Sequence, residues 1–548
     1  MKRYITFMLA ILASLSMSAD GLAPVPFDAQ LMQGSLDMRL RLNMQRLGEE
    51  KYQPDNVFLT MQQSGDWPGD TEGRTILALT LDAQALHSAS PNLEEILRRL
   101  PAHLNERGYM GPVFPDIIHE QQLSGNGWML RGLCEYYEWK HEAQILAMIS
   151  RMARGLFLPW KGHFSSYPVR PEDRKQDVGA ASGETVGQIG RWQLSSDVGC
   201  LFIGMDGLIH AYAVTRDEDL RPVIDELINC FLGIDLLAIK AQTHATLTAL
   251  RGLLRYAALT GERRLVDEAA KRFQLYTEYG MAENFGNYNW FRRYDTWTEP
   301  CAIVDSYLLA VQLWQQTRNV AYLEWAEQIY FNALCHGQRQ NGGFGCDNCP
   351  GRGSGTPNLK VNIPEAHWCC TMRGAEGLSN AARYSMQQSG DTLFFPFYRP
   401  ATFKAGIGKQ RVEVSEHTQY PFDGAVQFSL YMAKPCRMTL CFPHYAWMQD
   451  IEVQLNGKPA KAEECGGFLM LTRKFRQVDH IGIHFRLADR DLPLLNAENA
   501  LPEARRRIQH GPLLMGRREG SDVMQPVWHL MDSTVWDTND SGLRILFE

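Results

Sequence analysis

The sequence has little or none of what marks several protein classes. Only 12 of its 548 residues are cysteine, too few for a small disulfide-stapled scaffold. No long run of basic residues occurs, and Asp+Glu outnumber Lys+Arg by 62 to 55 for a net charge of −7. This balance argues against a nucleic-acid partner. The chain is 45% hydrophobic and 21% charged, which excludes a disordered or collagen-like protein. Its length allows two to four domains, or one large domain with an appendage.

Beyond the first twenty residues, no apolar run is long enough to span a bilayer, so we expect no stable membrane anchor. The N-terminal segment has a different pattern, in which Lys2 and Arg3 precede an apolar stretch at 4–15. Ser16 and Ser18 then supply the small residues of a cleavage site. The pattern predicts a signal peptide at 1–18 and an exported protein, periplasmic or extracellular. The first cysteine is Cys134, so there is no lipobox cysteine. The alternative is an uncleaved membrane anchor.

Residues 92–388 show helical periodicity, with apolar residues recurring at three and four. A Thr-centred polar turn joins two helical stretches at Thr215, Thr260 and Thr317. The spacings between these threonines, 45 and 57 residues, are typical of repeated helical hairpins. Such hairpins form either a solenoid or a closed toroid. Two long stretches, 163–197 and 341–366, interrupt the helical pattern. Long loops within a compact domain are often functional.

After about residue 391 the pattern changes to period two, which predicts short strands. Asn456-Gly457 is a strong hairpin-turn signal. Several short strands with turns between them indicate a β-sandwich. We therefore divide the mature chain into a helical domain at 19–390 and a β-sandwich at 391–548.

Cysteines and carboxylates form four clusters that could carry chemistry. They are Glu283, Glu299 with Cys301, Cys346 with Cys349, and the adjacent pair Cys369-Cys370. Adjacent cysteines rarely bond to each other because the ring they would close is strained. Such a pair therefore indicates two separate disulfides or two thiolates on one metal. Zinc takes four tetrahedral ligands from Cys, His and carboxylate.

Two ligand sets can complete such a zinc site. In both, Cys369 and Cys370 supply two ligands. The other two come from Glu299 and Cys301, or from the CxxC pair Cys346 and Cys349, whose spacing general rules favour. Cys346 and Cys349 could instead form a local disulfide.

The arrangement of these clusters resembles that of a known family. Glu283 precedes Glu299 by sixteen residues, Glu299-Pro300-Cys301 forms a Glu-x-Cys, and Cys369-Cys370 follows a long loop. This set resembles the β-L-arabinofuranosidase family, glycoside hydrolase family 127 and its close relatives. The helix at 242–256 resembles the one that carries a substrate-contacting histidine, here His244. The resemblance covers about residues 120–520.

The resemblance implies an exported retaining glycoside hydrolase that acts on plant-type glycans. In that family's pattern Cys369 is the nucleophile and Glu283 the acid/base. Glu299, Cys301, Cys369 and Cys370 would then hold zinc. With the sequence patterns, it predicts a multidomain α+β protein, an (α/α)6 toroid followed by a C-terminal β-sandwich. One departure concerns the helix near 204–212, where Gly207 aligns with a second sugar-contacting histidine of the family.

Other functions fit parts of the same pattern. The same machinery could act on a different, perhaps acidic, sugar. A non-catalytic carbohydrate-binding protein could carry a structural zinc. A lyase acting on uronic acids could also use a helical toroid.

Overall fold

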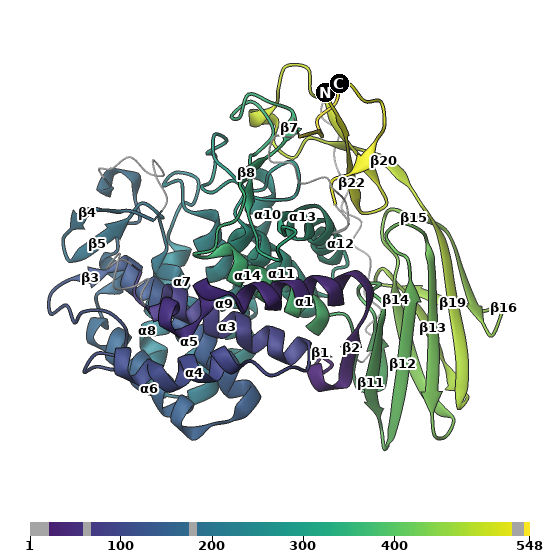
Figure 1. Ribbon diagram of the computed structural model, residues 1–548, viewed down its shortest axis with the longest axis horizontal. Helices are drawn as coiled ribbons and strands as arrows, with labels where there is room; N and C mark the ends of the chain where they lie inside the picture. The colour runs from purple at the N-terminus through teal and green to yellow at the C-terminus, as the bar shows by residue number, and fades with distance from the viewer. Residues whose placement is uncertain (1–20, 59–66, 175–182, 529–541) are drawn as a thin grey trace.

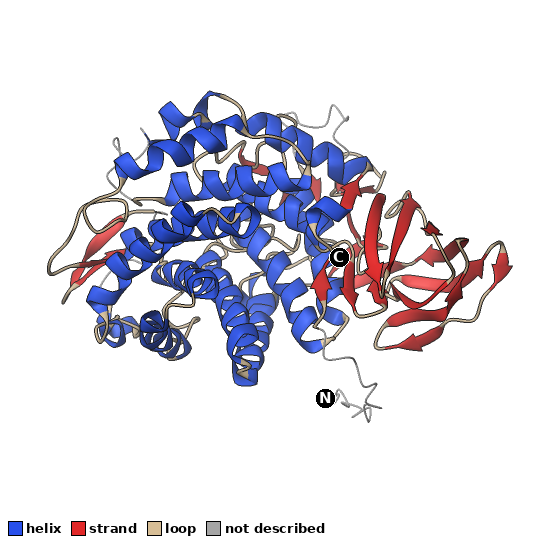
Figure 2. Cartoon of the chain, turned by 90° about the horizontal axis from the view of Figure 1, so that it is seen from below, coloured by secondary structure: helices blue, strands red, loops and turns tan. Residues whose placement is uncertain are grey.

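The structure is a computed structural model that describes residues 21–58, 67–174, 183–528 and 542–548. The expected signal peptide at 1–18 lies outside these residues. A helical region and a sheet-rich region lie side by side (Figure 1). Figure 2 shows the helices gathered at one end of the molecule and most strands at the other. None of the described helices combines the length and apolar character that a bilayer crossing requires.

The helical region is a ring of inner helices, each in contact with the next, and α14 contacts α3 to close it. The inner helices are α3 (Asp70–Ala85), α5 (Glu120–Lys140), α7 (Leu201–Thr215), α9 (Thr243–Thr260), α11 (Pro300–Thr317) and α14 (Cys370–Arg383). The outer helices are α1 (Gly34–Leu47), α4 (Pro91–Arg99), α6 (Ala143–Phe157), α8 (Arg221–Leu232), α10 (Arg263–Tyr279) and α12 (Ala321–Ile329). Two concentric layers of six confirm the predicted (α/α)6 toroid.

The repeated threonines end three inner helices. Thr215, Thr260 and Thr317 are the last residues of α7, α9 and α11. Each hydroxyl donates to the carbonyl four residues earlier at 2.7–2.9 Å. Each also accepts the N–H two residues later at 3.3–3.4 Å. The residue after each threonine is left-handed, so the chain leaves the helix and turns toward the outer layer. The predicted helical hairpins are therefore confirmed.

Charged side chains fill part of the ring's centre. Asp206 of α7 pairs with Arg131 of α5 and lies 2.5 Å from Arg255 of α9. Glu376 of α14 accepts from Arg131 at 3.0 Å and from Arg251 of α9 at 2.9 Å. These ion pairs join helices that hydrophobic contact alone would leave free to slide. Buried charges need such partners, because an unpaired one is costly in a low-dielectric interior.

The network continues toward α3. Asp305 of α11 pairs with Arg251 and, at 2.5 Å, with Arg373 of α14. The guanidinium of Arg373 lies 4.4 Å from the ring centre of Trp128, and that of Arg74 in α3 lies 4.2 Å from the same ring. Cation–π contact of this kind is strongest when desolvated. Through these contacts all six inner helices contribute a side chain to one polar core.

The sheet-rich region contains two larger sheets. One has the strand order β1 (Ala23–Pro24), β9 (Gln387–Ser389), β10 (Thr392–Phe394), β14 (Cys436–Pro443), β18 (Phe468–Phe475) and β17 (Glu463–Cys465). The other has the order β16 (Lys458–Pro459), β15 (Met448–Leu455), β19 (Val478–Leu487), β13 (Ala425–Met432), β12 (Gln410–Thr418), β11 (Ala401–Ile407) and β2 (Gln30–Met32). Side chains alternate between buried and exposed along β11 and β13, as the period-two pattern predicts.

Three further sheets, whose strands have at most six residues, complete the fold. One of them also has six strands: it runs β20 (Asp489–Pro493), β21 (Arg506–His510), β22 (Leu513–Arg518), β24 (Leu543–Arg544) and β7 (Asn358–Leu359), and β23 (Gln525–Pro526) pairs with β22. Near the ring, β3 (Ile118–His119), β5 (Trp192–Ser195) and β4 (Thr185–Ile189) form one small sheet, and β6 (Cys346–Asp347) pairs with β8 (Val361–Ile363).

Segments outside residues 391–548 also contribute strands to the sheets. The N-terminal strands β1 and β2 belong to the two larger sheets, although they precede the ring in sequence. Strand β9 already begins at Gln387, and β7 from the 341–366 stretch joins the sheet that contains β20. Strands of two or three residues are too short for an alternating pattern to reveal them.

The polar core yields a stability prediction. Asp206→Asn leaves Arg255 without its ion-pair partner and leaves Arg131 with Glu376 alone, in a buried setting. We expect a loss of about 3–5 kcal/mol in the free energy of unfolding, measured by chemical denaturation. Arg154→Ala is the control, because that exposed arginine pairs with Asp217 and Asp219 at the surface and should change stability by about 1 kcal/mol or less. Equal effects of the two variants would contradict a dominant role for the core network.

Candidate functional site

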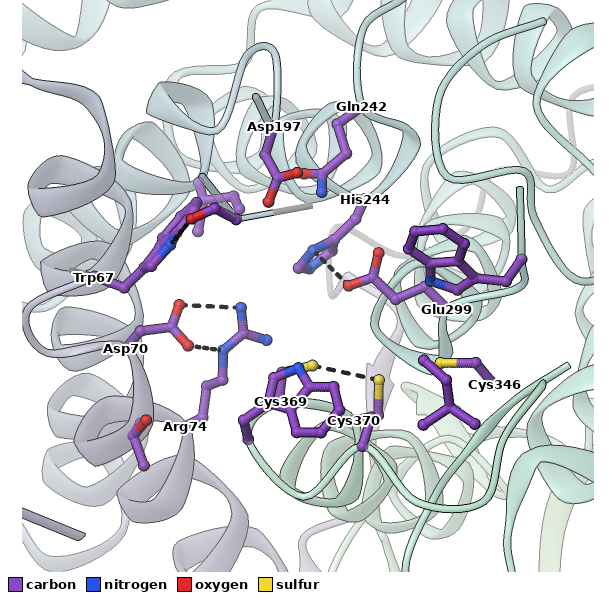
Figure 3. A pocket seen from close by; sticks show the side chains of 17 residues that line it. Trp67, Asp70, Arg74, Asp197, Gln242, His244, Glu299, Cys346, Cys369 and Cys370 are labelled. Carbon is purple, nitrogen blue, oxygen red and sulfur yellow. Dashed lines mark hydrogen bonds and ion pairs between the residues drawn. The ribbon is translucent and has the colours of Figure 1, made fainter. Parts of the chain in front are cut away.

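A cavity of about 410 Å³ opens where the N-terminal ends of the inner helices converge. Asp70 and Arg74 come from the first turns of α3, and His244 comes from the first turn of α9. Cys369 and Cys370 begin α14. Figure 3 shows these side chains around one hollow. The volume suits a small ligand, and the converging helix N-termini favour negative charge there.

Glu299 and Cys369 hold equivalent positions at two helix starts. Glu299 is the N-cap of α11, followed by Pro300 at the first helical position and then Cys301. Proline suits this position because it lacks an N–H that would be unbonded anyway. Cys369 is the N-cap of α14, and Cys370 is its first residue. A thiol at a helix N-terminus is held where a thiolate is stabilised.

Three of the predicted ligands form one thiol cluster. The sulfur of Cys370 lies 3.4 Å from that of Cys369 and 3.9 Å from that of Cys301. Sulfurs around a tetrahedral zinc with bonds of about 2.3 Å would lie about 3.8 Å apart. The distances therefore fit a shared metal ion, and they exceed the roughly 2.05 Å of a disulfide bond. All twelve cysteines lie in the described residues, and all are free thiols.

Glu299 and His244 adjoin this cluster. One ligand atom from each of His244, Glu299 and Cys301 lies within 4.8 Å of the others, as do those of the three cysteines. His244 Nδ1 is 3.6 Å from Glu299, and its Nε2 is 3.4 Å from Asp305. Either group could hold a metal ion, so His244 is placed as a possible ligand as well as a wall of the pocket.

Burial and neighbouring charge set the protonation of these groups. Burial raises the pKa of the Cys301 and Cys370 thiols well above the usual value. It raises that of Glu299 to about 7, with Asp197 adding to the effect. Arg74 opposes this trend, since its Nη1 lies 3.5 Å from the Cys301 sulfur. Thiolates here consequently need a cation beside them, and a metal ion would supply it.

The CxxC pair is split by the fold. Cys346 lines the pocket and its thiol interacts with that of Cys370. Cys349 is buried elsewhere, beside Ala282 and Tyr288, and its thiol donates to the carbonyl of Asn287 at 3.3 Å. The pair forms no disulfide. The alternative zinc ligand set, which needs Cys346 and Cys349 on one metal ion, is therefore not formed. Only Cys346 reaches the thiol cluster.

Glu283 is not among the residues that line this pocket. Its carboxylate lies 3.1 Å from Arg507 and accepts the backbone N–H groups of Leu495 and Asn496 at 2.9 and 3.1 Å. The side chain is 2% exposed. The expected acid/base residue is thus engaged with the loop between β20 and β21, and the structure does not bring it to the thiol cluster.

Several residues of the pocket carry no signal in the sequence patterns. Asp70 and Arg74 lie in the first turns of α3 without a motif, and only the convergence of the helix ends brings them to the site. Asp197 is the last residue of the 163–197 stretch, which its length marks as functional. On α7 the pocket residue is Ile203 rather than Gly207, whose Cα faces Gly127 of α5 too closely to admit a side chain.

Two family models match the chain. The GH127 β-L-arabinofuranosidase catalytic domain matches residues 203–383, and the GH127 middle domain matches residues 392–487. No protein of curated function matches the chain in sequence.

Solved structures share the fold. One described as a GH127 β-arabinofuranosidase has a TM-score of 0.68 at 14% identity, covering 91% of this chain and 86% of its own. A GH127 β-L-arabinofuranosidase from Geobacillus stearothermophilus T6 has a TM-score of 0.66 at 15% identity, covering 90% and 87%.

The toroid, its pocket and the matched models together define a glycoside hydrolase, which acts on a carbohydrate. Within that class, the chain belongs to the β-L-arabinofuranosidase family, glycoside hydrolase family 127.

The thiol cluster predicts which cysteines retain a metal. Cys301→Ser removes one sulfur from the cluster, so we expect loss of most bound metal, measured by elemental analysis of the purified protein. Cys349→Ser is the matched control, because this buried thiol bonds to a backbone carbonyl away from the cluster, and its metal content should stay unchanged. Equal metal loss in both variants would contradict the assignment.

The buried position of Glu283 predicts a stability effect. Glu283→Gln leaves the Arg507 charge unpaired, and we expect a loss of about 3–5 kcal/mol in the free energy of unfolding. Glu498→Gln is the control in the neighbouring loop, where an exposed ion pair with Arg292 should contribute about 1 kcal/mol or less. A Glu283→Gln protein of full stability that loses turnover would instead support the acid/base role implied by the resemblance.

Proposed function

We propose that the protein is a retaining glycoside hydrolase that removes a terminal β-L-arabinofuranose, or a related sugar, from plant-type glycans. The observation that carries this proposal is the position of Cys369. Its thiol stands in the pocket wall at a helix N-terminus, 3.4 Å from the Cys370 sulfur. A thiolate in that place is a positioned nucleophile.

The proposed reaction is a double displacement. The Cys369 sulfur attacks the anomeric carbon, and the bond to the departing sugar oxygen breaks. Water then displaces the sulfur and restores the original anomeric configuration. Sulfur thereby takes the place of the carboxylate nucleophile that most retaining glycosidases use.

The proposed metal is zinc. Glu299, Cys301, Cys369 and Cys370 would hold it, and a bound zinc ion keeps thiols deprotonated at neutral pH. Arg74 contributes from the protein side, since its guanidinium lies 3.5 Å from the Cys301 sulfur and is itself fixed by Asp70 at 2.6 Å. Both cations favour the charged form of the cluster.

Aromatic side chains would bind the sugar. Trp297 and Trp368 line the pocket, and Trp368 is 49% exposed beside Cys369. A large exposed ring at the mouth of a pocket is available for stacking on a sugar face. His244, held between Glu299 and Asp305, presents its ring to the same space. Burial holds the pKa of His244 well below its usual value, so it contacts the sugar as a neutral imidazole.

We also propose export to the periplasm or the outside of the cell. Its support is the sequence alone, in which two basic residues, an apolar stretch and small residues form a signal-peptide pattern at 1–18.

The role of Cys369 is tested by replacing it. Cys369→Ala should abolish turnover, a fall of at least about 10³-fold, because the nucleophile is lost. Activity is measured on aryl β-L-arabinofuranosides, and NMR of the first product shows whether configuration is retained. Cys230→Ser, on the outer helix α8, is the control. Retained turnover in Cys369→Ala would refute the proposal.

The same assay separates the alternative functions. A wild-type protein that binds sugars without turnover, equally with and without the Cys369 thiol, would be a carbohydrate-binding protein. An unsaturated product absorbing in the ultraviolet would indicate a lyase.

A further inference from the structure

One wall of the pocket is formed by Trp67, which lies just before α3. Figure 3 shows it beside Asp70, on the opposite side of the hollow from Glu299. We propose that Trp67 is a sugar-binding platform of this pocket, on which the ring of the bound sugar stacks. The inference deepens the proposed function and rests on it, since that sugar is the substrate of the proposed reaction.

The backbone of Trp67 has an unusual conformation. Its φ is 56°, in the left-handed region that a bulky side chain rarely adopts. Pro68 follows, and a residue before proline ordinarily takes an extended backbone. Left-handed residues elsewhere in the ring, such as Arg216 and Arg318, directly follow helices, where this conformation ends the helix. Trp67 comes before a helix instead, and strained residues of this kind gather at sites that grip a ligand.

A tight turn imposes this conformation. The N–H of Asp70 donates to the carbonyl of Trp67 at 3.0 Å. Between them, Pro68 comes second, and Gly69 comes third with φ 85° and ψ −2°, as a type II turn requires. The turn is wedged against α5, because a side chain at Gly125 would collide with the carbonyl oxygens of Trp67 and Pro68. Rigid backbone therefore places the indole before any ligand binds.

The only polar atom of the indole is already bonded. Its Nε1 donates to the carbonyl of Gly183 at 3.0 Å, and Gln121 of α5 donates to the same carbonyl at 3.0 Å. Tryptophan has no second donor and no acceptor, so Trp67 can bind a sugar only through its flat apolar faces. The C–H groups on one face of a sugar ring suit such a surface, because the face of an aromatic ring is electron-rich.

Trp67 also differs from the tryptophans that only fill the core. Trp128 and Trp290 are 0% exposed, whereas Trp67 is half-buried and lines the cavity. Cys369 lines the same cavity, whose volume is only about 410 Å³. A sugar that reaches the Cys369 thiol therefore lies within reach of this wall.

The turn links the platform to the thiol cluster. It also positions Asp70, whose two oxygens hold Arg74 at 2.6 and 3.1 Å. Arg74 in turn lies 3.5 Å from the Cys301 sulfur. A sugar stacked on Trp67 is consequently held at a fixed position relative to the thiols.

Two substitutions at Trp67 separate stacking from structural support. Trp67→Phe keeps an aromatic face and loses the indole donor, whereas Trp67→Gly removes the ring and suits the left-handed backbone. On aryl β-L-arabinofuranosides we expect KM to rise at least about tenfold in Trp67→Gly and about threefold or less in Trp67→Phe. The value of kcat should change much less, because a stacked ring contributes similarly to the bound substrate and to the transition state.

Binding of the product, L-arabinose, to the metal-loaded protein is a readout that does not depend on turnover. Its dissociation constant, measured by NMR titration, should rise by the same factors. Trp160→Ala is the control, because this half-buried ring lies in the short helix η4 (Leu158–Trp160) and is not among the residues that line the pocket. Circular dichroism and melting temperature are recorded for every variant.

A lower melting temperature in Trp67→Gly with unchanged KM and dissociation constant would show a structural role and overturn the proposal, as would a loss confined to kcat. If the wild type neither hydrolyses these glycosides nor binds L-arabinose, the proposed function and the platform fail together. If it binds L-arabinose without turnover, the proposed function fails, and the dissociation constants of the two variants still decide the platform. If the wild type is active and both Trp67 variants match it, only the platform is lost.

Discussion

The ring depends on the ion pairs buried along its axis. Asp206, Asp305 and Glu376 are fully buried, and the arginines around them come from neighbouring helices. Each pair fixes how far one helix has slid along the next, since a one-turn shift of about 5.4 Å would leave charges unpaired. Hydrophobic contact between the helices supplies most of the burial, but it is far less selective about register. The buried ion pairs therefore determine where each inner helix begins along the axis of the ring.

The position of these helix starts creates the site. Five inner helices, α3, α7, α9, α11 and α14, place residues at or near their N-terminal ends around the pocket, so their unbonded N–H groups and positive dipole ends face a single hollow. Thiols and carboxylates placed there face partial positive charge, and Arg74 strengthens it. His244 connects the pocket to the polar core, since its ring lies 3.6 Å from Glu299 of the site and 3.4 Å from Asp305 of the ion-pair network. The chemistry and the polar core are consequently parts of one connected structure.

Local patterns anticipate much of this, and their limits are physical. Periodicity predicts the helices and strands, and the threonine turns mark where inner helices end. The family resemblance implies the set of Glu299, Cys301, Cys369 and Cys370, whereas spacing rules alone favour the CxxC pair Cys346 and Cys349, which the fold separates. Glu283 shows the limit: its partner Arg507 lies 224 residues further along the chain, and no local signal announces that pairing.

The short N-terminal strands have a consequence for how the protein is made. Strands β1 and β2 leave synthesis first, yet their partners β9 and β11 lie more than 350 residues later. Neither larger sheet can be completed until that later segment has emerged from the ribosome. Pairings of such long sequence separation form slowly. The final closure of both larger sheets therefore waits for the last third of the polypeptide.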